Sequence, residues 1–218
     1  MWDFYPDIED ARAWYASAGL AHDFEHALRV LNLAMKIANN EAADLEIVYV
    51  AALLHDSRGA TPGGEDGARM GHHLASAQFA GEILAQAGWK QERIEAVQHC
   101  IRAHRYRHDG EQPQSLEAQS VFDADKLDVL GAVGVARTIA YATHAGQPFY
   151  ATPSQQFLKT GRRLPEEPHS AYHEYLFKLR HVKDRLYTST GKQIAAQREA
   201  ILHKFFNQLQ AECEGEAW

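Results

Sequence analysis

The chain has 218 residues, of which 45% are hydrophobic, and a formal net charge of −7. This length and composition suit a globular domain with an ordinary core, and the acidic balance argues against a surface for polymeric nucleic acid. The two cysteines predict reduced thiols, the acidic and aromatic first segment is no signal peptide, and no run approaches the roughly 20 apolar residues of a membrane span, so we expect a cytoplasmic protein without membrane attachment.

Helical spacing of apolar residues runs through the first half of the chain. The segment 44–56 is apolar on nearly all sides, so we expect a buried helix that begins after Asp44 as its N-cap. The glycine-rich segment 57–71 is expected to be a loop. The other helices predicted in this half span residues 24–40, 72–88 and 90–104, and Gly88 is the natural C-cap of the second.

The second half of the chain shows the same helical character. Residues 116–146 form either one long helix or two helices joined near Gly131. Residues 145–169 contain four of the seven prolines and are expected to be irregular. Closing helices are predicted over 171–191 and 192–213. Because no alternating strand pattern appears, we expect an all-α fold.

No linker divides the chain, so we expect one domain over residues 1–218. Its core is expected at about residues 20–145, and a C-terminal helical extension at about residues 170–212.

Three of the predicted helices carry polar residues where burial is expected. His26 shares a helix face with apolar residues, the pair His55–Asp56 ends the buried segment, and Asp125 lies in the mostly apolar stretch 121–136. A lone buried histidine most often bonds to a carbonyl, but a buried carboxylate without a partner is costly. One divalent cation would satisfy all four groups. Nitrogen and oxygen ligands without thiolate suit manganese, magnesium, iron, cobalt or nickel, and argue against a structural zinc site.

These residues resemble the ordered motifs of the HD-domain superfamily of metal-dependent phosphohydrolases. The matching stretches are "HDFEHALRV" around His26, "LLHD" with His55 and Asp56, and "ADKLD" with Asp125. The run "EAQSVFDADKLDVLGAVGVAR" and the closing "KLRHVKDRLYTSTGKQIAAQR" are similar to the small stand-alone bacterial HD proteins. The likeness covers most of the chain, from about residue 20 to about residue 210.

The resemblance implies a single HD-domain helical bundle with additional C-terminal helices, and a metal-dependent hydrolase of phosphate esters or anhydrides. It implies His26, His55, Asp56 and Asp125 as the metal ligands. Guanosine-tetraphosphate hydrolases of this superfamily carry a Glu-Asp pair shortly after the His-Asp. Here "SRGATPGG" follows instead, which argues against that particular activity.

Further residues are candidates for substrate binding or catalysis. We expect Asp56 to orient or deprotonate the attacking water. His104 continues an apolar stripe and should face inward, and the pattern around His72 favours it over its neighbour; for both, a second metal, a phosphate contact and ordinary packing stay open. The cationic candidates for clamping a phosphate are Arg58 and Lys126, expected in catalysis, and Arg29 and Arg102, expected in substrate binding.

The expected partner is a small phosphorylated substrate, a nucleotide in the first instance, and a homodimer is compatible with the sequence. We favour attack at an α-phosphorus or on a monophosphate, because no Walker-type loop is present. Two other classes stay open: a di-iron oxygenase on the same fold, and a nucleotide sensor without catalysis. The sensor is expected to have lost ligand positions, and all four are intact here.

Overall fold

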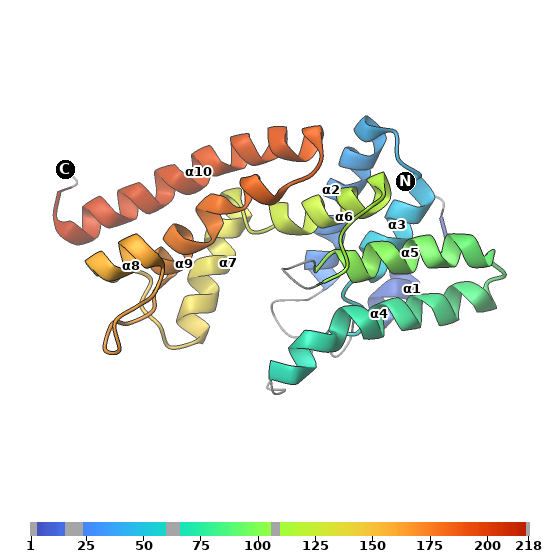
Figure 1. Cartoon of the computed structure of the whole chain (residues 1–218), viewed down its shortest axis with the longest axis horizontal. Helices are drawn as coiled ribbons and strands as arrows, with labels where there is room; N and C mark the ends of the chain where they lie inside the picture. Colours follow the sequence, from blue (N-terminus) through green and yellow to red (C-terminus); the bar gives the residue numbers. More distant parts are fainter. Residues whose placement is uncertain (1–3, 16–23, 60–65, 106–109, 217–218) are drawn as a thin grey trace. The chain divides into compact units, whose positions relative to one another are not determined.

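The computed structural model describes residues 4–15, 24–59, 66–105 and 110–216. Within these ranges the chain forms helices and loops and no strand, which confirms the predicted all-α fold (Figure 1). None of the described helices combines the length and the apolar character needed to cross a membrane. The α-helices are α1 (Ile8–Ala13), α2 (Phe24–Glu41), α3 (Leu45–Leu54), α4 (Asp66–Gln86), α5 (Gln91–Ala103), α6 (Leu116–Leu127), α7 (Gly131–His144), α8 (Gln155–Thr160), α9 (Ala171–Phe177) and α10 (Ser189–Glu214).

The chain groups into two compact units, and neither is one continuous segment. The first unit contains Met1–Asp125 and Leu186–Gly191, and the second contains Lys126–Arg185 and Lys192–Trp218. This division differs from the expected core and extension. Whether the two units fold as one domain stays a prediction.

Helix α3 is the centre of the first unit. It lies against α1, α2, α4 and α5, and its residues 47–54 are all buried. A helix that is apolar on every side must be surrounded, so the sequence of α3 accounts for its position. Asp44 is its N-cap as predicted, since its side chain accepts hydrogen bonds from the backbone N–H groups of Glu46 and Ile47. Helices α4 and α5 run side by side, joined through Gly88, whose φ of 79° needs a glycine (Figure 1).

The second unit is held by aromatic packing and by buried polar contacts. The rings of Tyr175 on α9 and Phe206 on α10 stack with their centroids 4.5 Å apart. Arg198 of α10 donates a hydrogen bond of 2.6 Å to the carbonyl oxygen of Leu127. Helix α7 lies against α9. These contacts tie α10 to α9 and to Leu127, the last residue of α6.

Several predicted boundaries differ from the structure. Helix α4 begins at Asp66, inside the segment predicted as a loop, and residues 60–65 of that loop lie outside the described ranges. A glycine at φ 72°, Gly131, separates α6 from α7, so residues 116–146 form two helices. Helix α8 lies within the region predicted to be irregular.

The predicted closing helix over 171–191 is wrong. Helix α9 ends at Phe177, two short 3₁₀ turns follow, and α10 already begins at Ser189. The interruption has a physical cause, because Asp123 accepts hydrogen bonds from the backbone N–H groups of Tyr187 and Thr188. Those two groups are thereby taken out of the helical pattern.

Candidate metal centre

Four predicted ligands come together in the first unit. His26 lies on the buried face of α2, His55 caps the C-terminal end of α3, Asp56 follows it, and Asp125 lies on α6. His26, His55 and Asp56 are at most 3% exposed. The side chain of Asp125 is 18% exposed, so it is less buried than expected and forms the open side of the cluster.

The ligand atoms of these residues face one another at short distances. His26 Nε2 lies 3.3 Å from His55 Nε2, 3.4 Å from Asp125 Oδ1 and 3.8 Å from Asp56 Oδ2. His55 Nε2 lies 3.6 Å from the same Asp56 oxygen. Metal–ligand bonds of about 2.0–2.2 Å place neighbouring ligand atoms of one ion about 3 Å apart. The spacing of His26, His55 and Asp56 therefore fits a single divalent cation, and Asp125 adds a carboxylate oxygen beside His26.

The hydrogen bonding of His55 prepares this ring for a metal. Its Nδ1 lies 2.8 Å from the carbonyl oxygen of Ala52, which only accepts, so the ring proton is on Nδ1 and the lone pair is on Nε2. Burial lowers the pKa of His55, which favours the neutral ring that a metal requires. Tyr15 supports the same turn, because its hydroxyl donates a 2.8 Å hydrogen bond to the carbonyl oxygen of Leu53.

A second group of ligand-type residues shares Asp56 with the first. Asp56 Oδ1 lies 3.2 Å from His72 Nε2 and 3.6 Å from His104 Nε2, and both histidines are buried. The structure thus brings His72 and His104 to Oδ1 of Asp56, whereas His26 and His55 lie at Oδ2. The contacts of Asp56 connect two groups that could each hold an ion: His26, His55 and Asp56, and Asp56, His72 and His104.

A short segment far along the chain fixes α6 beside α2. The carboxylate of Asp123, which is fully buried, accepts hydrogen bonds from the backbone N–H and the hydroxyl of Thr188 at 2.8 and 2.6 Å. The N–H of Thr190 donates a 2.7 Å hydrogen bond to Glu41 near the C-terminal end of α2. The segment Leu186–Gly191, here named the clamp segment, therefore joins the helix that carries His26 to the helix that carries the last ligand.

The predicted cationic residues are not all directed at the cluster. The guanidinium of Arg58 lies over the ring of Phe79, 3.7 Å from its centroid. Arg102 pairs with Glu111, with Nε and Oε2 2.5 Å apart. Arg29 and Lys126 are half-buried, and their catalytic and binding roles stay predictions, as do those of the other two.

Two further features of the first unit were not predicted. Arg105, just beyond α5, donates a 3.0 Å hydrogen bond to Nδ1 of His72. Its only signal in the sequence is its place directly after His104.

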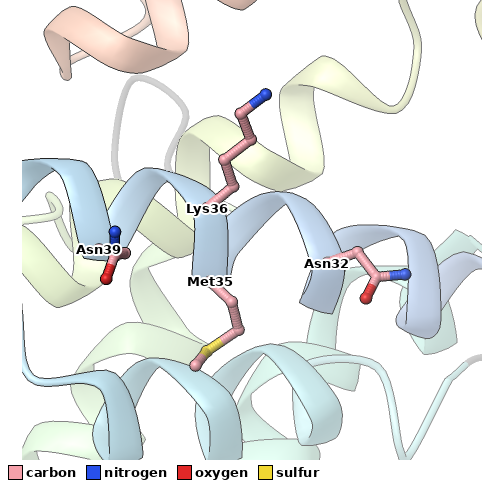
Figure 2. Close-up of a pocket in the computed structure, with 4 residues that line it drawn as sticks. All are labelled: Asn32, Met35, Lys36 and Asn39. Atoms are coloured by element: carbon pink, nitrogen blue, oxygen red, sulfur yellow. The ribbon is translucent and has the colours of Figure 1, made fainter. Parts of the chain in front are cut away.

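A hollow of about 420 Å³ lies beside α2 and is lined by Asn32, Met35, Lys36 and Asn39 (Figure 2). None of the clustered histidines or aspartates lines this hollow, so it is not part of the candidate centre.

Comparison with known proteins places this geometry in a family. The model of the HD domain matches residues 23–130, a range that contains all four predicted ligands. The protein YpgQ of Bacillus subtilis is 31% identical over 214 residues, which cover 95% of this chain and 94% of YpgQ. The chain belongs to the HD-domain superfamily.

Solved structures of HD proteins have the same fold. The crystal structure of YpgQ in complex with ADP has a TM-score of 0.69 and 29% identity, and the match covers 94% of this chain and 97% of that one. An HD-superfamily hydrolase from Bacillus thuringiensis has a TM-score of 0.68 and 26% identity, with 95% and 94% covered. The similarity extends beyond the HD match itself and includes the closing helices, as the sequence motifs indicated.

The donor set of this HD protein fits the divalent metal that such domains bind. Two imidazole nitrogens and the Asp56 carboxylate form a group that could hold an ion, and Asp125 Oδ1 lies 3.4 Å from one of these nitrogens. At least one of the imidazoles is fixed in the tautomer that coordinates through Nε2. Mixed nitrogen and oxygen sites of this kind accept several divalent ions.

Proposed function

We propose that this HD protein is a metal-dependent phosphohydrolase that acts on a small nucleotide, at a phosphate ester or anhydride bond. One observation carries the proposal: the buried ligand atoms of His26, His55 and Asp56 face one another at 3.3 to 3.8 Å, and Asp125 Oδ1 lies 3.4 Å from His26 Nε2. A buried carboxylate in this contact is stable only with a positive charge close to it. The ADP bound to YpgQ supports a nucleotide as the ligand.

Asp56 and His104 would have different roles in such a reaction. When bound, the cation supplies Lewis acidity and lowers the pKa of a coordinated water. Asp56 presents Oδ2 to the ligand cluster and Oδ1 to His72 and His104, so its carboxylate contacts both groups and can orient the water. The ring of His104 is fixed by a 2.6 Å hydrogen bond from Nδ1 to the carbonyl oxygen of Ile101, which leaves Nε2 able to accept a proton.

The position of attack is the finer part of the proposal. We favour the α-phosphorus of a nucleoside triphosphate, which releases pyrophosphate, or a nucleoside monophosphate, which releases orthophosphate. No Walker-type loop is present in the sequence to cradle a β- and γ-phosphate pair. Phosphorus NMR of the products distinguishes these outcomes from attack at the γ-phosphorus.

The test is a screen of nucleoside mono-, di- and triphosphates with manganese, magnesium, cobalt and nickel. Asp125→Ala should lower bound metal well below one per chain and abolish hydrolysis, because it removes one of four ligands. Glu166→Gln serves as the matched control, since this exposed carboxylate lies in the second unit. Full metal occupancy in Asp125→Ala would refute the ligand assignment.

A second function is favoured by the group of Asp56, His72 and His104. If this group also holds a metal, two irons sharing Asp56 would suit oxygen activation rather than hydrolysis. Oxygen uptake by the iron-loaded protein, together with inertness of the manganese-loaded protein toward every nucleotide, would establish this alternative.

A further inference from the structure

In the group of Asp56, His72 and His104, the Nδ1 atoms of the two histidines have opposite hydrogen-bond partners: an acceptor for His104 and a donor for His72. His104 Nδ1 lies 2.6 Å from a carbonyl oxygen, that of Ile101, so Nδ1 carries the ring proton and Nε2 carries the lone pair. His72 Nδ1 lies 3.0 Å from Nη1 of Arg105. A guanidinium only donates hydrogen bonds, so His72 Nδ1 must accept, and the proton of this neutral ring is on Nε2.

This difference decides which ring can bind a metal through Nε2. A coordinating imidazole needs its lone pair on the nitrogen that faces the ion and a proton on the other nitrogen, where a carbonyl or carboxylate usually accepts it. His55 and His104 meet this requirement through Ala52 and Ile101. His72 does not, because its proton is on the nitrogen that lies 3.2 Å from Asp56 Oδ1.

The charges around Asp56 lead to the same conclusion. The guanidinium of Arg105 places a positive charge next to His72, 3.0 Å from its Nδ1. A second divalent cation beside His72 would lie close to this guanidinium and be repelled by it. A phosphoryl group, in contrast, would be attracted by the same charge and could accept hydrogen bonds from an arginine.

We propose that Arg105 takes the place of a second metal: it holds His72 in the tautomer that does not coordinate, and it makes this half of the site a subsite for a phosphoryl group. The inference rests on the proposed function for the nature of the ligand, and it assigns one metal ion per chain. His72 acts here as a positioning residue, with Nδ1 on Arg105 and the N–H of Nε2 directed toward the centre of the site.

The first measurement is the metal content of the manganese-loaded protein. We expect one manganese per chain and an electron paramagnetic resonance spectrum of isolated ions. In Arg105→Ala the proton of His72 is able to move to Nδ1, so the manganese content should rise toward two per chain, with an exchange-coupled spectrum. Arg105→Lys, which keeps the charge, should stay near one. Lys90→Gln is the control, since Lys90 is exposed at the opposite end of α5 and its side chain makes no capping hydrogen bond.

The second measurement is the affinity of the manganese-loaded protein for inorganic phosphate, by titration calorimetry. Loss of a charge-assisted hydrogen bond predicts that Arg105→Ala binds phosphate about tenfold more weakly or worse, with a smaller loss in Arg105→Lys. Two coupled manganese ions in the unaltered protein would overturn the inference. So would an Arg105→Ala variant that matches the unaltered protein in both metal content and phosphate affinity.

Neither measurement depends on turnover, so the two proposals fail separately. A protein with one manganese per chain and arginine-dependent phosphate binding, yet inert toward nucleotides, would refute the proposed function and keep the inference.

Discussion

Among the described residues, a buried cluster of histidine and carboxylate lies in each unit, and the two clusters differ in how their polar atoms are matched. In the second unit, Glu167 accepts hydrogen bonds from the N–H and hydroxyl of Ser154 at 2.7 and 2.6 Å and from the N–H of Leu164 at 2.8 Å. His173 Nε2 lies 3.1 Å from the same carboxylate, and its Nδ1 lies 2.7 Å from the hydroxyl of Ser170. Each acceptor named here faces a donor.

In the first unit, atoms that can accept hydrogen bonds face one another instead. The lone pair of His55 Nε2 faces another imidazole nitrogen, that of His26, at 3.3 Å and the Asp56 carboxylate at 3.6 Å. The second unit's cluster contains serine, histidine and glutamate in contact, which are also the members of a catalytic triad. Ser170 and His173 are at most 1% exposed, however, and Ser170 is the N-cap of α9. Donor–acceptor matching, rather than residue composition, separates a structural cluster from a ligand site.

The largest expected difference between the clusters is in metal binding. Asp56→Asn removes a charge from the first cluster and should weaken metal binding by more than about 100-fold, because even supporting groups around a metal contribute about 10- to 100-fold. Glu167→Gln should keep the metal and lower the midpoint of thermal unfolding. Metal analysis and calorimetry of both variants check this. Loss of metal in Glu167→Gln would show that the two clusters do not differ in their effect on metal binding.

Removal of the metal should destabilise the first cluster alone. A ligand present at about 100 times its dissociation constant stabilises the folded state by about 2.7 kcal/mol, so a chelator should lower the unfolding midpoint of the unaltered protein. Asp56→Asn should not respond to chelator, whereas Glu167→Gln should respond as the unaltered protein does. An unchanged midpoint after confirmed metal loss would mean that the first cluster is satisfied by other partners.

Lowering the pH should remove the contribution of Glu167, in the second cluster, to the stability of the folded state. Burial acts to raise the pKa of Glu167, but hydrogen bonds from Ser154, Leu164 and His173 outweigh it and lower the pKa to about 2. The ordinary value is about 4.3. The carboxylate therefore stabilises the folded state fully above about pH 4.3 and loses this contribution as the pH falls toward about 2. The difference in unfolding midpoint between the unaltered protein and Glu167→Gln should shrink over that interval, and a constant difference would contradict the assignment.

The smallest expected effect comes from the clamp segment. Thr188→Val removes the hydroxyl that donates to Asp123 and accepts from the N–H of Gly191. It should weaken metal binding by a few-fold up to about tenfold, because α6 is then less firmly placed. Thr188→Ser keeps the hydroxyl and should restore the affinity measured by calorimetry. Equal affinities in the two variants would show that α6 is positioned without this contact.

The fold class and the burial of His26, His55 and Asp56 were predictable because periodicity shows which helix faces are buried; their role as metal ligands, with Asp125, stays a prediction. His26, His55 and Asp56 lie where the apolar pattern places the core. Asp123 and Asp125 were harder to separate, since both lie in one apolar stretch. The carboxylate of Asp123 accepts hydrogen bonds from the backbone of the clamp segment, which lies more than 60 residues later in the chain. A contact between residues so far apart in sequence leaves no local pattern.

The contacts of cationic side chains were not predictable in the same way. Arg58 was expected at the site because it follows the His-Asp pair. Its guanidinium lies over the ring of Phe79, which belongs to the next helix, α4. Arg105 lies 33 residues from its partner His72 and outside any helical periodicity. Long flexible side chains choose partners in three dimensions, so their sequence position indicates little about where the charge lies.

The clamp segment has a consequence for how the protein is made. The HD match ends at residue 130, but the first unit is completed by Leu186–Gly191, which a ribosome delivers only after some 55 further residues. A nascent chain that has already presented His26, His55, Asp56 and Asp125 still lacks the contacts that hold α2 and α6 together. Metal capture is therefore expected late in synthesis, and a fragment cut at the HD boundary should bind metal more weakly than the full chain. Adding a peptide with the clamp sequence to that fragment would show whether these six residues are what is missing.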